Sequence, residues 1–85
     1  MFNGGATVAS DCVFGKLVAV FKYDRTRHNV VALDKGSYNS CQTPGGAKIY
    51  NSGNDRITLA KGPNYFICNF PGHCESAMKI AVNAA

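Results

Sequence analysis

The sequence predicts an all-β protein, a small antiparallel sandwich or barrel, and three observations support this fold class. Short runs rich in Val, Ile, Phe and Tyr alternate with clusters of Gly, Asn, Asp, Ser and Pro, as strands alternate with turns. No stretch carries an apolar stripe of helical period longer than two turns. The 85 residues are 46% hydrophobic and 16% charged and contain no low-complexity tract, which is typical of one globular domain over residues 1–85.

The strands are expected in the following order. Residues 17–23 and 28–33 are apolar runs on either side of the polar turn 24–27, so 17–33 is predicted to be a hairpin. Residues 34–37 end this hairpin, and 38–46, which contains Pro44 and two glycines, is predicted to be a loop. The remaining strands are expected at 47–50, 55–60, 64–69 and 78–82.

Charge and length exclude several functions. The net charge of +4 comes from scattered Lys and Arg residues without a basic block, which argues against nucleic-acid binding and favours weak attraction to acidic partners or surfaces. No apolar run approaches the roughly 20 residues that cross a bilayer. Four cysteines in so short a chain indicate disulfides in an oxidising compartment or a metal site.

One motif carries candidate metal chemistry. Cys68, His73 and Met78 follow one another at equal steps, as Cys-x4-His-x4-Met, after an apolar strand. A thiolate, an imidazole and a thioether suit a soft, redox-active metal. Taken singly, each residue has an ordinary explanation, a buried thiol or disulfide half, a surface histidine and a core methionine. The spacing of the three is what makes a site the stronger hypothesis.

His28, the other histidine of the chain, begins a predicted strand. If strand 28–33 lies beside strand 64–69, His28 completes a set of two imidazoles, one thiolate and one thioether. Two His and one Cys with a weak axial Met is the arrangement that holds blue copper, and it implies one-electron transfer through a single Cu(I)/Cu(II) ion. Zinc is the main competitor, although a thioether suits zinc poorly.

Cys74 directly follows His73, and neighbouring residues of a turning chain do not easily direct both side chains at one ion. Cys74 is therefore expected to pair with Cys41 and to tether the ligand loop to the body of the fold. The alternative, in which Cys41, Cys68 and Cys74 are all structural, stays open at this point.

These residues resemble a known family. Residues 65–83, from Tyr65 through Cys-Asn-Phe-Pro-Gly-His-Cys to Asn83, resemble the C-terminal part of the phytocyanins, plant type 1 copper proteins, and among them the plantacyanins or basic blue proteins. The likeness continues upstream through 28–31, 38–44, 46–50 and 52–59 and covers roughly residues 17–85.

The resemblance implies a cupredoxin-like Greek-key sandwich, copper ligands at His28, Cys68, His73 and Met78, and a disulfide between Cys41 and Cys74. It also implies that Asn29, beside the first histidine, hydrogen-bonds around the thiolate, and that the protein is secreted to the extracellular matrix or cell wall. The redox donor or acceptor and the oligomeric state are not indicated.

The N-terminal part departs from the family. Residues 1–16 lack the family's tryptophan-containing motif, and the chain has no tryptophan at all. The first strand is therefore expected to be shortened or atypical, which would expose a sheet edge. Cys12 has no counterpart in the family, and its role stays undetermined.

Three functions compete. The first is copper electron transfer without enzymatic activity. The second is an extracellular signalling or cell-wall interaction module, as in plantacyanin-like proteins linked to plant reproduction, in which copper is incidental. The third is a Cys/His enzyme, and 85 residues leave little room for the cleft and oxyanion hole that it needs.

Overall fold

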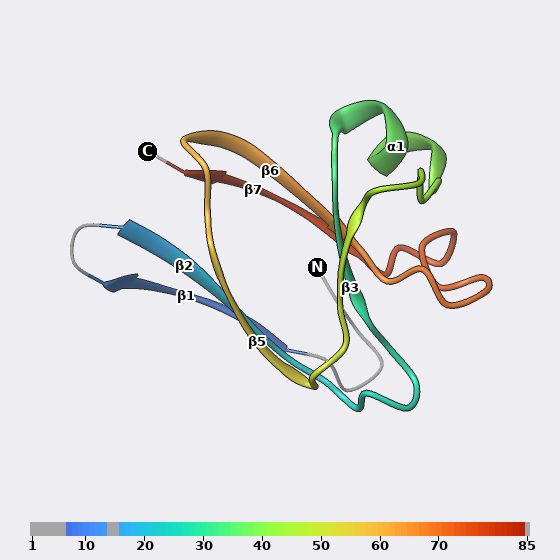
Figure 1. Cartoon of the computed structure of the whole chain (residues 1–85), viewed down its shortest axis with the longest axis horizontal. Coiled ribbons are helices and arrows are strands. Elements are labelled where there is room, and N and C mark those ends of the chain that lie inside the picture. The colour runs from blue at the N-terminus through green and yellow to red at the C-terminus, as the bar shows by residue number, and fades with distance from the viewer. Residues whose placement is uncertain (1–6, 14–15, 85) are drawn as a thin grey trace.

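The computed structural model describes residues 7–13 and 16–84 and shows a two-sheet β-protein with one short helix (Figure 1). The elements in chain order are β1 (Thr7–Val13), β2 (Lys16–Lys22), β3 (Val30–Leu33), α1 (Lys35–Ser40), β4 (Lys48–Tyr50), β5 (Asn54–Thr58), β6 (Gly62–Ile67) and β7 (Lys79–Ala84). No helix in the described ranges has the length and apolar character needed to pass through a bilayer.

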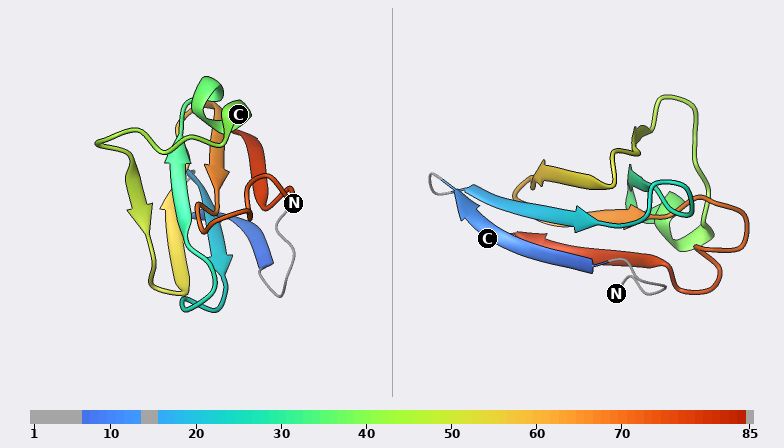
Figure 2. Two further views of the ribbon diagram at one scale, coloured as in Figure 1. Left: turned by 90° about the vertical axis from the view of Figure 1, so that its right-hand side faces the viewer. Right: turned by 90° about the horizontal axis from the view of Figure 1, so that it is seen from below.

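The strands form two antiparallel sheets that pack face to face (Figure 2). One sheet has three strands in the order β1-β2-β5, and the other has four in the order β4-β3-β6-β7. The chain leaves the four-stranded sheet after β4, adds β5 to the other sheet, and returns with β6 beside β3. The predicted all-β sandwich is therefore confirmed.

The predicted hairpin 17–33 is wrong. β2 pairs with β5, with Phe21 opposite Asp55, whereas β3 pairs with β6, with Val31 opposite Ile67. The turn 24–27 instead carries the chain from one sheet to the other. A crossing between sheets and a hairpin both need a polar turn between two apolar runs, so the local pattern does not distinguish them.

The turn 24–27 is built around Asp24. Its carboxylate accepts hydrogen bonds from the backbone N–H and the hydroxyl of Thr26, at 2.9 and 2.6 Å, and these bonds lower the pKa of Asp24. Its carbonyl accepts from the N–H groups of Arg27 and His28, at 2.9 and 3.0 Å. The turn therefore fixes the position of His28, two residues before β3 begins in the four-stranded sheet.

The main core lies between the two sheets. Phe21 of one sheet and Phe66 of the other meet edge to face, with ring centroids 4.9 Å apart. The buried residues of this core come from both sheets and from the segments after β6: Ala19, Phe21, Val30, Ile57, Phe66, Cys68 and Met78. Cys68 is thus fully buried within this core.

A second apolar cluster covers the outer face of the four-stranded sheet. Val31, Ile67 and Cys74 form its buried centre, with Leu33, Tyr38, Cys41 and Ala47 packed around them. Phe66 and Cys68 belong to the inner core and Ile67 to this outer cluster, which confirms the alternation predicted along this segment. Helix α1 contributes Tyr38 to this outer cluster.

Helix α1 was not predicted, because its six residues are too few to show a helical stripe. The carboxylate of Asp34 caps it by accepting a hydrogen bond from the Ser37 N–H at 2.7 Å, and this bond lowers the pKa of Asp34. The helix ends at Cys41, whose φ of 56° places it in the left-handed region. A helix therefore stands where the sequence suggested only turns and a loop.

At the N-terminal end, β1 pairs with β2 along its full length, from Thr7 opposite Lys22 to Val13 opposite Lys16. The sequence predicted a shortened or atypical first strand without giving its bounds, and the structure shows a strand of seven residues here. β1 is the edge strand of the three-stranded sheet. The backbone of Cys12 lies opposite Leu17, and the side chain of Cys12 lies outside the described part of the structure.

Candidate metal centre

The pairing of β3 with β6 brings His28 and Cys68 together. Val31 lies opposite Ile67 in antiparallel register, so the residues just before β3 meet those just after β6 at one end of the sandwich. His73 follows in the turn 69–77, which projects from the same end (Figure 1, right-hand side; Figure 2, right-hand view). Three segments that are distant in sequence thus supply one site.

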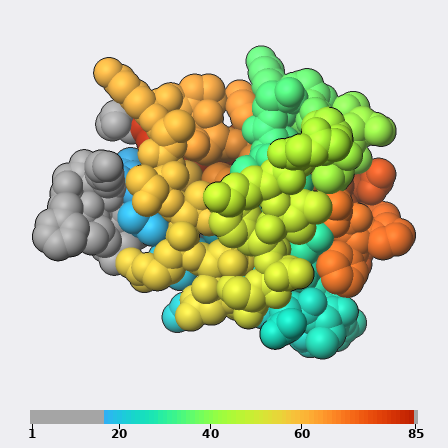
Figure 3. Space-filling model, in the orientation of Figure 1, coloured from blue at the N-terminus to red at the C-terminus, as the bar shows by residue number. Residues whose placement is uncertain are grey.

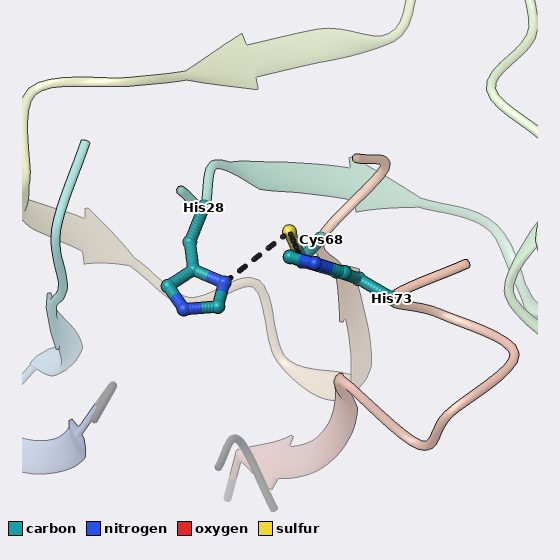
Figure 4. Close-up of side chains that lie close together, drawn as sticks. All are labelled: His28, Cys68 and His73. Atoms are coloured by element: carbon teal, nitrogen blue, oxygen red, sulfur yellow. Dashed lines mark hydrogen bonds between the residues drawn. The ribbon is translucent and has the colours of Figure 1, made fainter. Parts of the chain in front are cut away.

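The imidazole rings of His28 and His73 both face the Cys68 sulfur (Figure 4). Its Sγ atom lies 3.8 Å from Nδ1 of His28 and 3.3 Å from Nδ1 of His73. The two imidazole centroids are 5.0 Å apart, with their planes inclined by 48°. One donor atom from each residue lies within 4.8 Å of the other two.

These separations fit a shared metal ion. Sulfur and nitrogen donors at about 2.3 and 2.0–2.1 Å from one ion, with bond angles of about 100–120°, stand about 3.3–3.8 Å apart. The two measured sulfur–nitrogen distances span this range. The donor set, one thiol and two imidazoles, suits copper chemically. His28, Cys68 and His73 can therefore hold one copper ion.

The site is buried on one side and open on the other. Cys68 is fully buried and His28 is 5% exposed, whereas His73 is half-buried. The ring of His73 stacks on that of Phe70, at 5.9 Å and 20°. In Figure 3 the segment that carries His73 lies at the right-hand surface, between α1 above and the turn 24–27 below. Of the three residues, His73 is the one closest to solvent.

Met78 lies next to the site in the main chain. It is 4% exposed and belongs to the same buried core as Cys68. Its carbonyl accepts from the Cys68 N–H at 3.0 Å, and its own N–H donates to the His73 carbonyl at 2.9 Å. The structure thus brings the Met78 backbone to two of the predicted ligands, and the role of its thioether as a fourth ligand stays a prediction.

Asn29 fastens two of the ligand segments to each other. Its side-chain oxygen accepts from the Asn69 N–H at 2.9 Å, and its side-chain nitrogen donates to the Asn69 side-chain oxygen at 2.6 Å. The Asn69 side chain in turn donates to the Thr43 hydroxyl at 3.2 Å. The predicted effect of Asn29 on the thiolate stays a prediction.

Asn69 and Thr43 were not singled out from the sequence. The available signal was the position of Asn69, a polar residue between the predicted ligand Cys68 and the turn that follows. Thr43 gave no signal, because its partner lies 26 residues away in the chain.

The disulfide joins Cys41 to Cys74, as expected, with the two Cα atoms 5.7 Å apart. Cys74 is buried in the outer cluster against Val31 and Ile67, whereas His73 points toward Cys68. The side chains of His73 and Cys74 therefore lie on different sides of the sheet. The disulfide links the turn 69–77, which carries His73, to the end of α1.

Tyr23 packs against the core that contains Cys68. Its hydroxyl donates to the Asp55 carboxylate and lies 3.1 Å from the Tyr50 carbonyl, and the second oxygen of Asp55 accepts from the Ser52 hydroxyl at 2.7 Å. Burial and the bond to Asp55 raise the pKa of Tyr23 to about 12. Tyr23 is thus a neutral phenol at ordinary pH.

Known proteins resemble this chain in sequence and in fold. Residues 13–78 match the family described as plastocyanin-like domain. The chain is 69% identical over 67 residues to a basic blue protein of Arabidopsis thaliana, which covers 79% of this chain and 52% of that protein. The chain thus spans about half the length of that relative.

Two solved structures have the same fold. Cucumber basic protein, a blue copper protein, superposes with a TM-score of 0.78 and 57% identity over 80% of this chain and 71% of that one. Spinach plantacyanin superposes with a TM-score of 0.79 and 50% identity over 100% of this chain and 87% of that one.

Proposed function

Since this chain belongs to the phytocyanin family of plastocyanin-like domains, we propose that it is a mononuclear type 1 copper protein that carries single electrons. When bound, copper would supply the one-electron Cu(I)/Cu(II) couple. The observation that carries the proposal is the convergence of the donors of His28, Cys68 and His73 within 4.8 Å. The proposed role is not enzymatic.

The strand pairing and the disulfide hold these three residues in place. His28 and Cys68 are fixed by the β3–β6 pairing, and His73 by the turn that the disulfide anchors. A site whose donors are already in position needs little rearrangement when the charge at its centre changes. We assign the fourth position to the thioether of Met78 and the fastening of the ligand segments to Asn29.

The half-buried His73 is the proposed route for electrons, because it joins the buried thiol to the surface. The partner is inferred to be an acidic redox protein or an acidic extracellular surface, since the chain carries a net charge of +4. A disulfide is typical of oxidising compartments, so we place the protein outside the cell, with residues 1–85 acting as one domain.

An optical titration tests the proposal. Adding Cu(II) to the purified apo protein is expected to produce an intense blue colour that ascorbate bleaches. The Cys68→Ser variant should lose this band, whereas Cys12→Ser, the same change at a cysteine outside the predicted ligand set, should keep it. A blue band that persists in Cys68→Ser would rule out ligation by the Cys68 thiolate.

A second experiment separates electron transfer from a signalling role in which copper is incidental. His73→Ala is expected to weaken copper binding, because one of the four proposed donors is lost, while the apo fold survives. If the biological activity of the protein persists unchanged in this variant, the copper site does not carry that activity.

A further inference from the structure

The ligand turn ends in a recognisable backbone motif. The N–H of Met78 donates to the His73 carbonyl at 2.9 Å, and the N–H of Ala77 donates to the Cys74 carbonyl at 2.9 Å. Ala77 has a φ of 69°, in the left-handed region. These features define a Schellman motif: one hydrogen bond joins the sixth residue to the first, a second joins the fifth residue to the second, and the fifth residue is left-handed. Here the first residue is His73, the fifth is Ala77 and the sixth is Met78.

This motif relates two of the proposed ligands. Its outer hydrogen bond always joins the sixth residue to the first, and here those residues are Met78 and His73. Side chains at these two positions commonly contact one another in Schellman motifs. The four-residue gap between His73 and Met78 therefore has a structural reason, because it is the gap that this turn imposes.

Met78 is also fixed from its other side. Its carbonyl accepts the N–H of Cys68 at 3.0 Å, so both backbone polar groups of Met78 bond to residues of the metal centre. Ala77 precedes this clamped residue, and its left-handed backbone sets the direction in which the chain reaches Met78. A change of φ at Ala77 would therefore move the Met78 side chain relative to Cys68 and His73.

Alanine is an unusual residue at this position. The motif most often has glycine there, because a Cβ atom clashes with the backbone in the left-handed region. Among the described residues, the other positive-φ positions are Gly46, Gly53, Gly62, Gly72 and the disulfide-bonded Cys41. The Ala77 side chain is exposed, so burial of its methyl group does not offset the strain.

We infer that Ala77 is a positioning residue, whose strained left-handed turn sets where the Met78 thioether stands relative to Cys68 and His73. The part of the inference that concerns copper rests on the proposed function, whereas the part that concerns the turn does not. In the copper protein, the position of the thioether would decide how strongly Met78 binds the ion and hence the balance between Cu(I) and Cu(II).

Two substitutions at Ala77 act in opposite directions. Ala77→Gly keeps the turn and removes the strain, so the melting temperature of the apo protein should rise by about 2–5 °C. Ala77→Val places a β-branched residue where φ is positive, which such residues rarely tolerate, so the turn should open. Because position 77 is exposed, neither new side chain enters the core, and the core is affected only through the displacement of Met78 that an opened turn would cause.

Ala81, an exposed residue of β7, provides the matched control. Ala81→Gly should lower the melting temperature, the reverse of Ala77→Gly, because glycine weakens a strand interior. Ala81→Val should leave the protein folded, since β-branched residues suit strands. If glycine at position 77 destabilises the apo protein as much as glycine at 81, the strain at Ala77 is refuted.

The turn itself is read by NMR of the apo protein. In Ala77→Val the Met78 amide should exchange with solvent about tenfold faster than in the parent, and not in Ala81→Val. Nuclear Overhauser contacts from the Met78 methyl group to the Cys68 and His73 side chains should weaken in the same variant. Unchanged exchange and contacts would overturn the inference.

Copper gives the last readout. In Ala77→Val the ratio of Cu(I) to Cu(II) affinity should change by about threefold or more, with Ala81→Val at the parent value. An unchanged ratio in a variant whose turn has opened would show that the turn is structural only. If the parent protein takes up no copper, the proposed function fails, and the apo NMR still decides whether Ala77 positions Met78.

Discussion

His73 and Cys74 are consecutive in the chain, but their side chains make contacts on different sides of the four-stranded sheet. His73 reaches the Cys68 sulfur at 3.3 Å, whereas Cys74 is bonded to Cys41 in the outer cluster. One short turn thus supplies a candidate ligand and its own anchor. The two adjacent residues thus have different roles, since His73 is a candidate ligand and Cys74 forms the disulfide. The disulfide therefore helps to hold the candidate site in place.

Removing the disulfide in a Cys41→Ser/Cys74→Ser variant should destabilise the fold by about 4 kcal/mol, since the bridge joins residues 33 positions apart. Urea denaturation measures the loss. Copper affinity should fall as well, because the turn with His73 loses its covalent link to α1. A variant that binds copper as tightly as the parent would show that the hydrogen bonds of the turn are sufficient anchors.

Replacing Asn29 with Ala should cost about 1–3 kcal/mol of unfolding free energy, because the partly buried groups of Asn69 lose their partners. Thr43→Val removes the exposed end of the same network and should cost less than about 1 kcal/mol. Chemical denaturation of both variants and of their double mutant measures the coupling. Equal losses in the two single variants would contradict the larger role of Asn29 in the network.

The stability of the protein should fall at high pH because of Tyr23. Its pKa is raised from 10.0 to about 12 in the folded state, so the unfolded chain loses the phenol proton first. The stabilisation is complete below pH 10 and is lost as the pH rises through about 12. Tyr23→Phe should flatten this part of the curve, as measured by denaturation at several pH values; an identical slope in both proteins would assign the effect to other groups.

At low pH, the cap of α1 should weaken. The pKa of Asp34 is lowered by its bond to the Ser37 N–H, so its contribution is present above the ordinary value of 3.8 and is lost as the pH falls through the lower folded pKa. Asp34→Ala should destabilise the protein at neutral pH, whereas Asp34→Asn, which also caps, should change it less. Acid titration followed by circular dichroism compares the three proteins.

Met78→Leu tests the proposed fourth ligand. Leucine is similar in volume to the buried methionine, so the fold should lose less than about 1.5 kcal/mol. The reduction potential of the copper-loaded protein should rise, because Cu(II) would lose a donor that Cu(I) needs less. Voltammetry measures the potential, and Leu59→Met, at a partly buried residue of the same core, controls for a general change in packing.

Much of the fold followed from local patterns, and the rest did not for identifiable reasons. The alternation of Phe66, Ile67 and Cys68 correctly separated the inner core from the outer cluster. The turn 24–27 was predicted correctly. The strands on either side of it pair with β5 and β6, which lie far along the chain, so the local sequence could not show that they belong to different sheets. Helix α1 depends on a single cap at Asp34, and β1 lies where the sequence is least typical of a strand.

The candidate site was more predictable than the fold around it. Cys68 and His73 are five residues apart, so the motif was visible locally, and His28 was the other imidazole in the sequence. What the sequence did not show was the support of these residues. The Asn29–Asn69–Thr43 network depends on three-dimensional proximity, and the left-handed turn at Ala77 occupies a position where glycine is the usual signal.

The β3–β6 register, which sets residue 28 beside residue 68, has a consequence for how metal and folding depend on each other. The entropy needed to bring together groups 40 residues apart is offset by sheet formation, so the ion meets donors that the native state has already assembled. Any copper bound only by that state then adds to the free energy of unfolding, by about 1.4 kcal/mol for each tenfold excess of free ion over its dissociation constant. The melting temperature of this small protein should therefore report how much copper its surroundings hold.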